Sequence, residues 1–282
     1  MNSAKITNKI KHTLGLKSDS IIIVSVSGGM DSMALAYMLK SLSCKVAIVH
    51  FNHQQRQQSE KEAEMVKSFA KEMDYDFHYY KLDLLNYNFQ HQAHKMRIYH
   101  LKEVANMYKT PYILTAHHAD DLLESILIKL TKGSNLLGYA GMQYAHKKDG
   151  FIFVKPFLYT SKKEIASYVD TKKIPYMTDD SNHSDDYLRN RFRHTVTPIL
   201  KQENPNLLET AESYHHQITD AFRFIRKQTL NAFIESKVIH LNHFKAQEKA
   251  LQHDMIAYLI EENQLKPNYR TIIKIREMLL SK

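Results

Sequence analysis

Residues 21–32, with the sequence IIIVSVSGGMDS, decide the fold class of this chain. The apolar run at residues 21–26 is typical of a buried strand, and a helical stretch follows at about residues 31–42. Between them stands the segment Ser27-Gly28-Gly29-Met30-Asp31-Ser32. Two glycines let a backbone turn tightly and approach a ligand, and free N–H groups at a helix start favour anions. The segment therefore predicts a phosphate-binding loop, with a plain Gly-Gly turn as the alternative.

The same order of strand and helix recurs as far as about residue 171. Further strands are expected at residues 45–51, 77–82, 112–116 and 151–157, and further helices at residues 59–73, 92–108, 121–130 and 161–171. Strands that alternate with helices of this length indicate a parallel sheet with right-handed crossovers. We therefore expect an α/β, Rossmann-like fold in which ligands bind at the carboxyl ends of the strands.

Beyond residue 198 the strand pattern ends, and apolar residues recur at helical spacing instead. Pro205 is a plausible boundary. We predict an α/β catalytic domain over residues 1–205 and a smaller, all-helical domain over residues 206–282.

The net charge of this 282-residue chain is +9, and 28 of the 39 basic and 21 of the 30 acidic residues precede residue 206. An anionic partner such as RNA fits this excess, and a Lys-rich proteome explains it equally well. No apolar run approaches the roughly 20 residues that span a bilayer, and residues 1–17 lack an apolar signal-peptide core, so we expect a cytoplasmic protein without a membrane partner. Cys44 is the only cysteine, which excludes an intramolecular disulfide and Cys-rich metal sites.

Histidines stand at the ends of two predicted strands. The second strand ends in His50-Phe51-Asn52-His53, where nucleotide contact or packing is a better interpretation than a metal site because no carboxylate is near. The fourth is followed by His117-His118-Ala119-Asp120-Asp121 and then by Glu124. Asp121 and Glu124 share one helical face and could hold Mg²⁺ or the ammonium of a substrate amine. The alternatives are acids that only satisfy the helix N-terminus, or a metallohydrolase site.

These motifs carry a resemblance. Residues 27–32 resemble the PP-loop of ATP pyrophosphatases, Ser-Gly-Gly-x-Asp-Ser, and lack the Gly-Lys-Ser/Thr end of a Walker loop. With the His-His-x-Asp-Asp-x-x-Glu pattern of residues 117–124 and the block Asp179-Asp180-Ser181-Asn182 to Arg189-Asn190-Arg191, the chain is similar to the tRNA(Ile)-lysidine synthase family over roughly residues 20–200. Two features depart from the family. Residues 93–98 keep only the second of two arginines, Arg97, and a further C-terminal domain is missing, so we expect either a short member or a chain that continues.

The resemblance implies ligation of L-lysine to carbon 2 of the wobble cytidine of tRNA(Ile) with a CAU anticodon, through an adenylated base. ATP and Mg²⁺ are the implied cofactors, AMP and pyrophosphate the products, and a homodimer is an open alternative. Rival interpretations are a tRNA thiolase, which needs a cysteine pair or an iron–sulfur cluster, an amidotransferase-type ligase, and a catalytically silent RNA-binding relative.

The implied site residues have four roles. Contacts to ATP are expected from Ser27, Gly28, Gly29, Met30, Asp31, Ser32, His50, His53 and His117. Asp31 and Asp120 are expected to bind Mg²⁺, and Asp121, Glu124 and Arg193 to bind substrate. Catalytic roles are expected for Asp31, Arg97, His118, Asp121, Arg189 and Arg191. In these roles His118 or Asp121 accepts the proton of the amine, and arginines neutralise charge on the α-phosphate, with RNA-phosphate binding as the alternative for the arginines.

Overall fold

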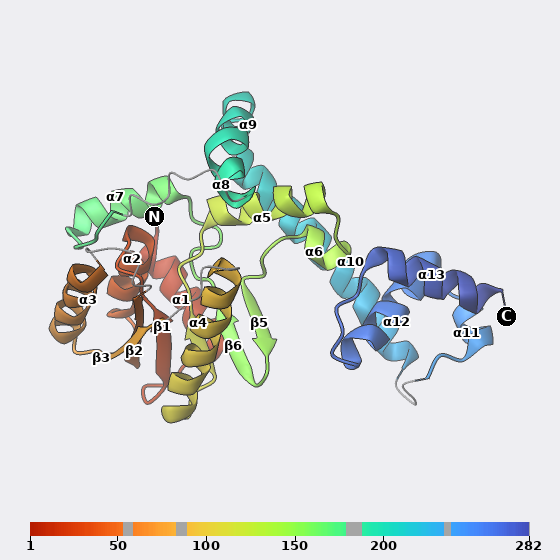
Figure 1. The fold of residues 1–282 in the computed structure, drawn as a ribbon, viewed down its shortest axis with the longest axis horizontal. Helices are drawn as coiled ribbons and strands as arrows, with labels where there is room; N and C mark the ends of the chain where they lie inside the picture. Colours follow the sequence, from red (N-terminus) through yellow and green to blue (C-terminus); the bar gives the residue numbers. More distant parts are fainter. Residues whose placement is uncertain (53–58, 83–88, 179–187, 234–237, 282) are drawn as a thin grey trace. The chain divides into compact units, whose positions relative to one another are not determined.

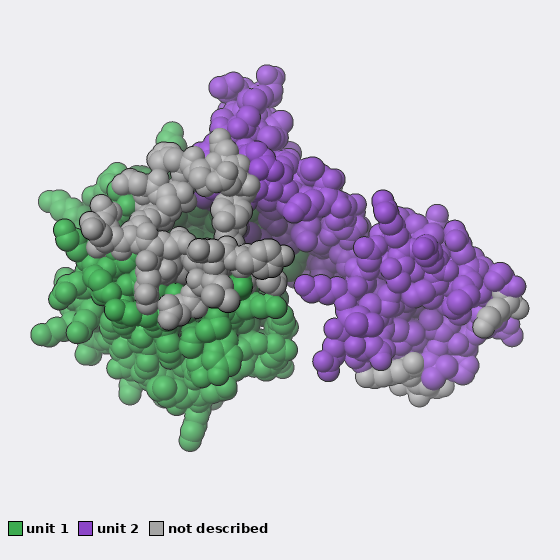
Figure 2. Space-filling view, in the orientation of Figure 1, with its two compact units in different colours: residues 1–122, 143–186 green, residues 123–142, 187–282 purple. Residues whose placement is uncertain are grey.

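The computed structural model describes residues 1–52, 59–82, 89–178, 188–233 and 238–281. The chain divides into two compact units, which Figure 2 distinguishes by colour. Unit 1 comprises residues 1–122 and 143–186, and unit 2 comprises residues 123–142 and 187–282. The boundary that the sequence suggests after residue 205 stays a prediction.

The described part of unit 1 is built on a six-stranded sheet (Figure 1). Its order is β3-β2-β1-β4-β6-β5, and every neighbouring pair is parallel except β5 with β6. This confirms the predicted α/β class and adds β5, a short hairpin partner that the sequence analysis did not expect. The strands are β1 (Ile21–Ser25), β2 (Lys45–Asn52), β3 (Asp76–Lys81), β4 (Tyr112–Leu114), β5 (Ala145–Lys148) and β6 (Phe151–Val154).

Helices cover both faces of this sheet, which explains why its central strands are almost entirely apolar. Ile22 and Val24 of β1 pack with Leu35 of α2 in one buried cluster, whereas Ile23 packs with Leu101 and Val104 of α4 in another. Successive residues of a strand point to opposite faces, so β1 alone contributes to both cores. The helices of unit 1 are α1 (Ser3–Leu14), α2 (Met30–Leu39), α3 (Ser59–Met73), α4 (Phe89–Met107) and α7 (Lys162–Lys172), and α5 (Ala119–Lys132) begins there.

Unit 2 is helical over its described residues, as the sequence predicts for the C-terminal region. Its small core gathers Phe244, Met255 and Ile272 from three helices. The longest helix, α10, follows α9 and a π-helical turn at Phe192–Val196 (Figure 1). Among the described residues, no helix is long and apolar enough to cross a membrane. The helices are α6 (Leu136–Tyr139), α8 (Leu188–Arg191), α9 (Thr197–Glu203), α10 (Leu207–Ala232), α11 (Leu241–Lys245), α12 (Lys249–Glu262) and α13 (Tyr269–Leu280).

Candidate active site

The topology of the sheet brings the two sequence motifs to one place. β1 pairs with β2 on one side and with β4 on the other, so the order of the strands reverses between β1 and β4. Open α/β sheets bind their ligands at such a switch point, outside the carboxyl ends of the strands. The segment of residues 27–32, here called the phosphate loop, leaves β1 at this edge, and the segment that contains His118 leaves β4 beside it.

The backbone of the phosphate loop depends on one glycine. Gly28 has a φ of +89°, a conformation that residues with a side chain rarely adopt. A Cβ atom added there would lie 3.4 Å from Cγ2 of Val66, so the position is also close to α3. The carbonyl of Gly28 accepts a hydrogen bond from the N–H of Met177 at 3.0 Å. Gly29 then forms the N-cap of α2 without a side-chain cap, so the first N–H groups of α2 are available to an anion.

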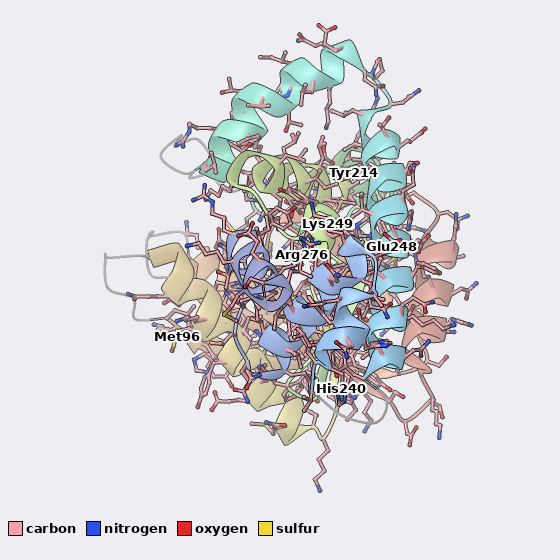
Figure 3. All side chains as sticks on the ribbon, turned by 90° about the vertical axis from the view of Figure 1, so that its right-hand side faces the viewer. Met96, Tyr214, His240, Glu248, Lys249 and Arg276 are labelled. Carbon is pink, nitrogen blue, oxygen red and sulfur yellow. The ribbon has the colours of Figure 1, made fainter. Side chains whose placement is uncertain are left out.

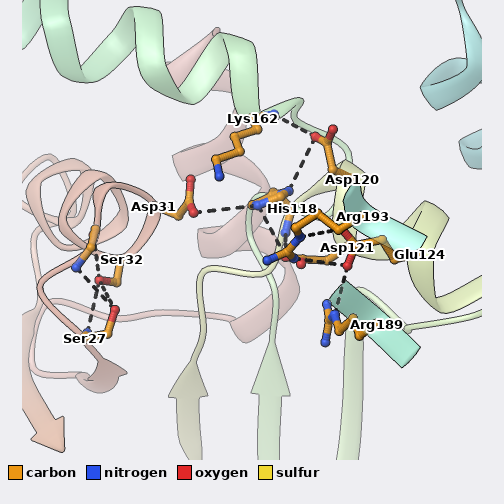
Figure 4. Close-up of polar contacts among 11 residues, drawn as sticks. Ser27, Asp31, Ser32, His118, Asp120, Asp121, Glu124, Lys162, Arg189 and Arg193 are labelled. Atoms are coloured by element: carbon orange, nitrogen blue, oxygen red, sulfur yellow. Dashed lines mark hydrogen bonds and ion pairs between the residues drawn. The ribbon is translucent and has the colours of Figure 1, made fainter. Parts of the chain in front are cut away.

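Two hydroxyl groups close the loop. Oγ of Ser32 donates to the carbonyl of Gly29 at 2.9 Å and accepts from the N–H of Ser27 at 3.1 Å. Oγ of Ser27 lies 3.1 Å from Oγ of Ser32 and accepts from the N–H of Gly29 at 3.3 Å (Figure 4). These bonds fix the turn before any ligand arrives, which lowers the entropy cost of binding phosphates.

Three carboxylates surround a buried histidine next to the loop (Figure 4). His118 is 5% exposed, and its Nε2 lies 3.7 Å from Oδ2 of Asp31 and 3.5 Å from Oδ2 of Asp121. Its Nδ1 lies 3.5 Å from Oδ2 of Asp120. Burial disfavours the imidazolium, but the interaction with Asp120 and the charges of Asp121 and Asp31 outweigh it and raise the pKa of His118. The arrangement suits a group that accepts a proton and holds the positive charge.

Asp120 and Asp121 also organise the backbone around His118. Oδ2 of Asp121 accepts from the N–H of His118 at 3.0 Å, so the third residue of α5 caps its own helix. Oδ2 of Asp120 accepts from the N–H of Lys162 at 2.9 Å, at the first residue of α7. The capping role that the sequence suggested for one of these acids is therefore present, and it holds both carboxylates against the imidazole.

In unit 2, the carboxylate of Glu124 is held by arginines. Glu124 is 1% exposed, and its Oε1 accepts from Nε of Arg193 at 2.8 Å. Its Oε2 accepts from Nε of Arg189 at 2.9 Å and from Nη2 of Arg193 at 3.1 Å. Hydrogen bonds between ions of opposite charge are short and strong, and the fork of Arg193 matches the carboxylate in two places. Glu124 thus orders the segment from α8 to the π-helical turn, where the sequence places its basic block.

Comparison with known proteins agrees with this geometry. A family model described as a PP-loop domain matches residues 2–200. The chain belongs to this family. Among curated relatives, the tRNA(Ile)-lysidine synthase of Aster yellows witches'-broom phytoplasma (strain AYWB) is 38% identical over 92% of the chain and 61% of the relative. That of Bacillus subtilis (strain 168) is 35% identical over 80% of the chain and 51% of the relative.

These matches confirm the resemblance that the sequence motifs predicted. The chain spans 61% and 51% of the length of those two relatives. The PP-loop fold is also seen in a solved structure, the U34-tRNA thiolase of Methanococcus maripaludis with its [4Fe-4S] cluster. It superposes with a TM-score of 0.64 at 15% identity and covers 77% of this chain and 78% of that one. At that identity the likeness shows the fold alone.

Three other residues that the resemblance implies for the site, His50, His117 and Arg97, are at least partly buried. His50 is buried, its Nδ1 lies 2.9 Å from the carbonyl oxygen of Val26, and burial lowers its pKa, so it packs beneath the loop as a neutral ring. Nδ1 of His117 lies 3.0 Å from Oγ1 of Thr115. Arg97 is half-buried on α4, where burial lowers the pKa of its guanidinium.

The remaining predicted positions divide between helix ends and segments that are not described. Met30 is the first residue of α2, and Arg191 is exposed at the end of α8. His53 and the block of residues 179–182 lie outside the described residues.

One basic residue near the carboxyl edge of the PP-loop sheet was not predicted. Lys155 directly follows β6, and its Nζ donates to the carbonyl of Gln143 at 3.3 Å. Burial lowers the pKa of Lys155 to about 8. A lysine between an apolar strand and Pro156 was the available signal in the sequence.

The predicted reaction implies a magnesium ion. Among the described residues no group of three His, Cys, Asp or Glu side chains is arranged to hold a metal ion. Mg²⁺, however, is commonly held by one or two carboxylates together with substrate phosphates and water. Asp31, in the PP-loop and in the first turn of α2, has the donor type and the place for this. The residues therefore fit such an ion, with the metal role of Asp120 still a prediction.

Proposed function

We propose that this chain carries out the tRNA(Ile)-lysidine synthase reaction, in which ATP drives the joining of L-lysine to carbon 2 of the wobble cytidine of a CAU anticodon. The observation that carries the proposal is the meeting of a PP-loop with His118, which three carboxylates surround at 3.5 to 3.7 Å. The PP-loop suits the binding of phosphates, and the His118 cluster suits a proton transfer. The proposed reaction needs both. The names of the curated relatives support the choice of substrate.

In the first step, the 2-carbonyl oxygen of the cytidine attacks the α-phosphate of ATP, and pyrophosphate leaves. The N–H groups that begin α2 and the hydroxyls of Ser27 and Ser32 hold the phosphates in place for this displacement. We propose that Arg97, Arg189 and Arg191 neutralise the negative charge that develops on the α-phosphate. A magnesium ion on Asp31 would neutralise charge on the departing pyrophosphate.

In the second step, the side-chain amine of L-lysine attacks carbon 2 of the adenylated base, and the carbon–oxygen bond to AMP breaks. An alkyl ammonium has a pKa near 10.4, so the amine must lose a proton before it can attack. We propose that His118 or Asp121 accepts this proton, since the carboxylates around His118 stabilise its protonated form. We also propose that Asp121 and Glu124 select the ammonium form on arrival and that Arg193 contacts substrate.

The two predicted domains divide this work. We propose that residues 1–205 perform the chemistry and that the helical residues 206–282 contact the tRNA. The basic block at Arg189–Arg193, which shortly precedes the helical residues in the chain, supports an RNA contact in this region, since phosphates favour arginine-rich surfaces.

The proposal is tested by incubating the protein with ATP, Mg²⁺, L-lysine and a tRNA(Ile) transcript that carries the CAU anticodon. We expect AMP to form only when both the transcript and lysine are present. AMP formation that needs neither, or that needs ammonia instead of lysine, would contradict the assignment and favour another PP-loop ligase.

A further inference from the structure

Unit 2 contains a cavity that the proposed reaction does not use. Its volume is about 220 Å³, and helices α10, α12 and α13 contribute most of its wall. Pockets for drug-sized ligands usually measure roughly 300–1,000 Å³, so this one suits a flat group of about the size of a single base. The lining residues that matter here are Phe222, Ala250, His253, Asp254, Tyr269 and Ile272.

Aromatic side chains line this cavity. Tyr269 is about half exposed at the start of α13, and its ring meets the ring of His253 edge to face, with centroids 5.6 Å apart. Phe222, on α10, also lines the cavity, and its ring centroid lies 4.9 Å from the guanidinium carbon of Arg226. Flat rings at the mouth and the wall of a small cavity are the surfaces on which unstacked bases are held.

A polar atom in the wall has no partner among the described residues. Nε2 of His253 is buried and makes no hydrogen bond there. Leaving a buried ring nitrogen unsatisfied costs free energy, so such an atom indicates a missing ligand or water. Burial and the positive charges of Arg276 and Lys249 lower the pKa of His253, so its ring is neutral and can donate at one nitrogen and accept at the other.

Two cations act on His253 from outside the lining of the cavity, whereas the charge of Arg226 in the wall is compensated. In the wall, Arg226 donates from Nε and Nη2 to Asp254 at 2.8 and 3.0 Å and from Nη1 to Glu261 at 2.7 Å. Lys249 and Arg276, labelled in Figure 3, act on His253 from the neighbouring turns of α12 and α13. An apolar interior with two cations beside it is complementary to a base that carries a phosphate.

We propose that this cavity receives one unstacked nucleobase of the RNA substrate, with a flanking phosphate near Lys249 and Arg276. The base stacks on Tyr269, and its entry shifts the ring of His253 so that the buried Nε2 pairs with the polar edge of the base. This inference rests on the proposed function, because it takes RNA to be the substrate. It adds a base-binding site in unit 2 that the reaction chemistry does not require.

The test uses the full chain and a fluorescein-labelled tRNA(Ile) transcript with a CAU anticodon as the probe. Ala250→Trp fills the mouth from an exposed position, and His253→Ala removes the pairing atom. Both variants should raise the dissociation constant of the transcript by about tenfold, the usual size of one lost base stack. Phe224→Ala is the matched control, since Phe224 is a 67% exposed aromatic residue of α10 that does not line the cavity.

A second measurement does not depend on any variant. Ultraviolet cross-linking of the transcript to the wild-type protein, followed by mass spectrometry, should place adducts on peptides that contain His253 or Tyr269. If the wild-type protein binds RNA, but Ala250→Trp binds as Phe224→Ala does and no adduct falls on α12 or α13, the cavity proposal is overturned and the proposed function stands. If the wild-type protein does not bind the transcript at all, the proposed function fails, and this inference fails with it.

Discussion

Arg193 holds Glu124 through two hydrogen bonds, with Nε 2.8 Å from Oε1 and Nη2 3.1 Å from Oε2. The two residues are 69 positions apart in the chain. Arg189 adds a third bond to the same carboxylate at 2.9 Å. A buried acid that binds two arginines in this way fixes their side chains, and it has little capacity left for a substrate ammonium until an arginine moves.

Glu124→Gln separates two interpretations of this carboxylate. If it mainly orders the arginines, the free energy of unfolding should fall by about 1.5–3 kcal/mol, the usual contribution of hydrogen bonds to charged groups. If it mainly binds the lysine ammonium, the concentration of lysine for half-maximal rate should rise while pyrophosphate release and stability are spared. Urea unfolding and steady-state kinetics measure both. Asp220→Asn is the control, because Asp220 and Arg223 form an exposed pair at 3.4 Å that should contribute little.

Gly28→Ala should damage the PP-loop through its backbone. A side chain at a φ of +89° costs about 1–2 kcal/mol, and the added Cβ meets α3 at 3.4 Å. We expect a lower melting temperature without nucleotide and weaker ATP binding by calorimetry. Gly29→Ala, at an N-cap with a φ of −75° that alanine adopts readily, should lower the melting temperature by less than Gly28→Ala does. Equal melting temperatures for all three proteins would show that the turn does not need a glycine at position 28.

Asp31→Ala should abolish tRNA-dependent pyrophosphate release while the fold stays intact. Removing one preorganised charge from a phosphate site typically costs at least about 10²–10³-fold in rate. The control is Asp19→Ala, which removes an exposed acid of the same unit. Circular dichroism checks the fold, and turnover near that of the wild type would remove Asp31 from the mechanism.

Stability should depend on pH through His215, which is 2% exposed and whose Nδ1 lies 2.7 Å from the carbonyl oxygen of Ala140. Burial is the main cause that lowers the pKa of His215. The hydrogen bond to the carbonyl of Ala140 acts against this lowering, whereas the charges of His216 and Arg223 add to it. Below the ordinary histidine pKa of about 6.5 the unfolded chain therefore binds a proton that the folded chain does not, and stability is lost as the pH falls. This contribution is fully present above about pH 6.5.

Urea unfolding at several pH values between 5 and 8 tests this dependence. His215→Gln should show a smaller loss of stability on acidification than the wild type. His12→Gln, at an exposed position of α1, should show the wild-type loss. A His215→Gln profile parallel to that of the wild type would rule out His215 as a source of the pH dependence.

Much of the fold was predictable because it depends on local patterns. The strands and helices of unit 1 lie within a few residues of their predicted positions, since buried parallel strands are continuous apolar runs. The helix predicted at residues 161–171 begins with a capping box, in which Ser161 and Glu164 bond to each other's backbone N–H groups. β5 was missed because its sequence, AHKK, has the polar character of an exposed edge strand.

The site was predictable only in part. The loop and the His118 cluster follow from motifs at strand ends, because parallel strands place their carboxyl ends at one edge. The bonds from Glu124 to Arg189 and Arg193 could not be predicted, since 65 and 69 residues separate the partners and no local pattern encodes such a distance. The cavity of unit 2 was missed for the same reason, because its wall is assembled from residues 135 to 272.

The central claim is that the PP-loop and the His118 cluster join a lysine to a tRNA base. Its most direct test is the transfer of radiolabelled L-lysine to a tRNA(Ile) transcript, followed by nuclease digestion and analysis of the nucleosides. We predict that the label appears in the wobble nucleoside of the CAU anticodon, that ATP is required, and that replacing the wobble cytidine by uridine abolishes it. Formation of AMP with the transcript and lysine present, but without label in that nucleoside, would contradict the account.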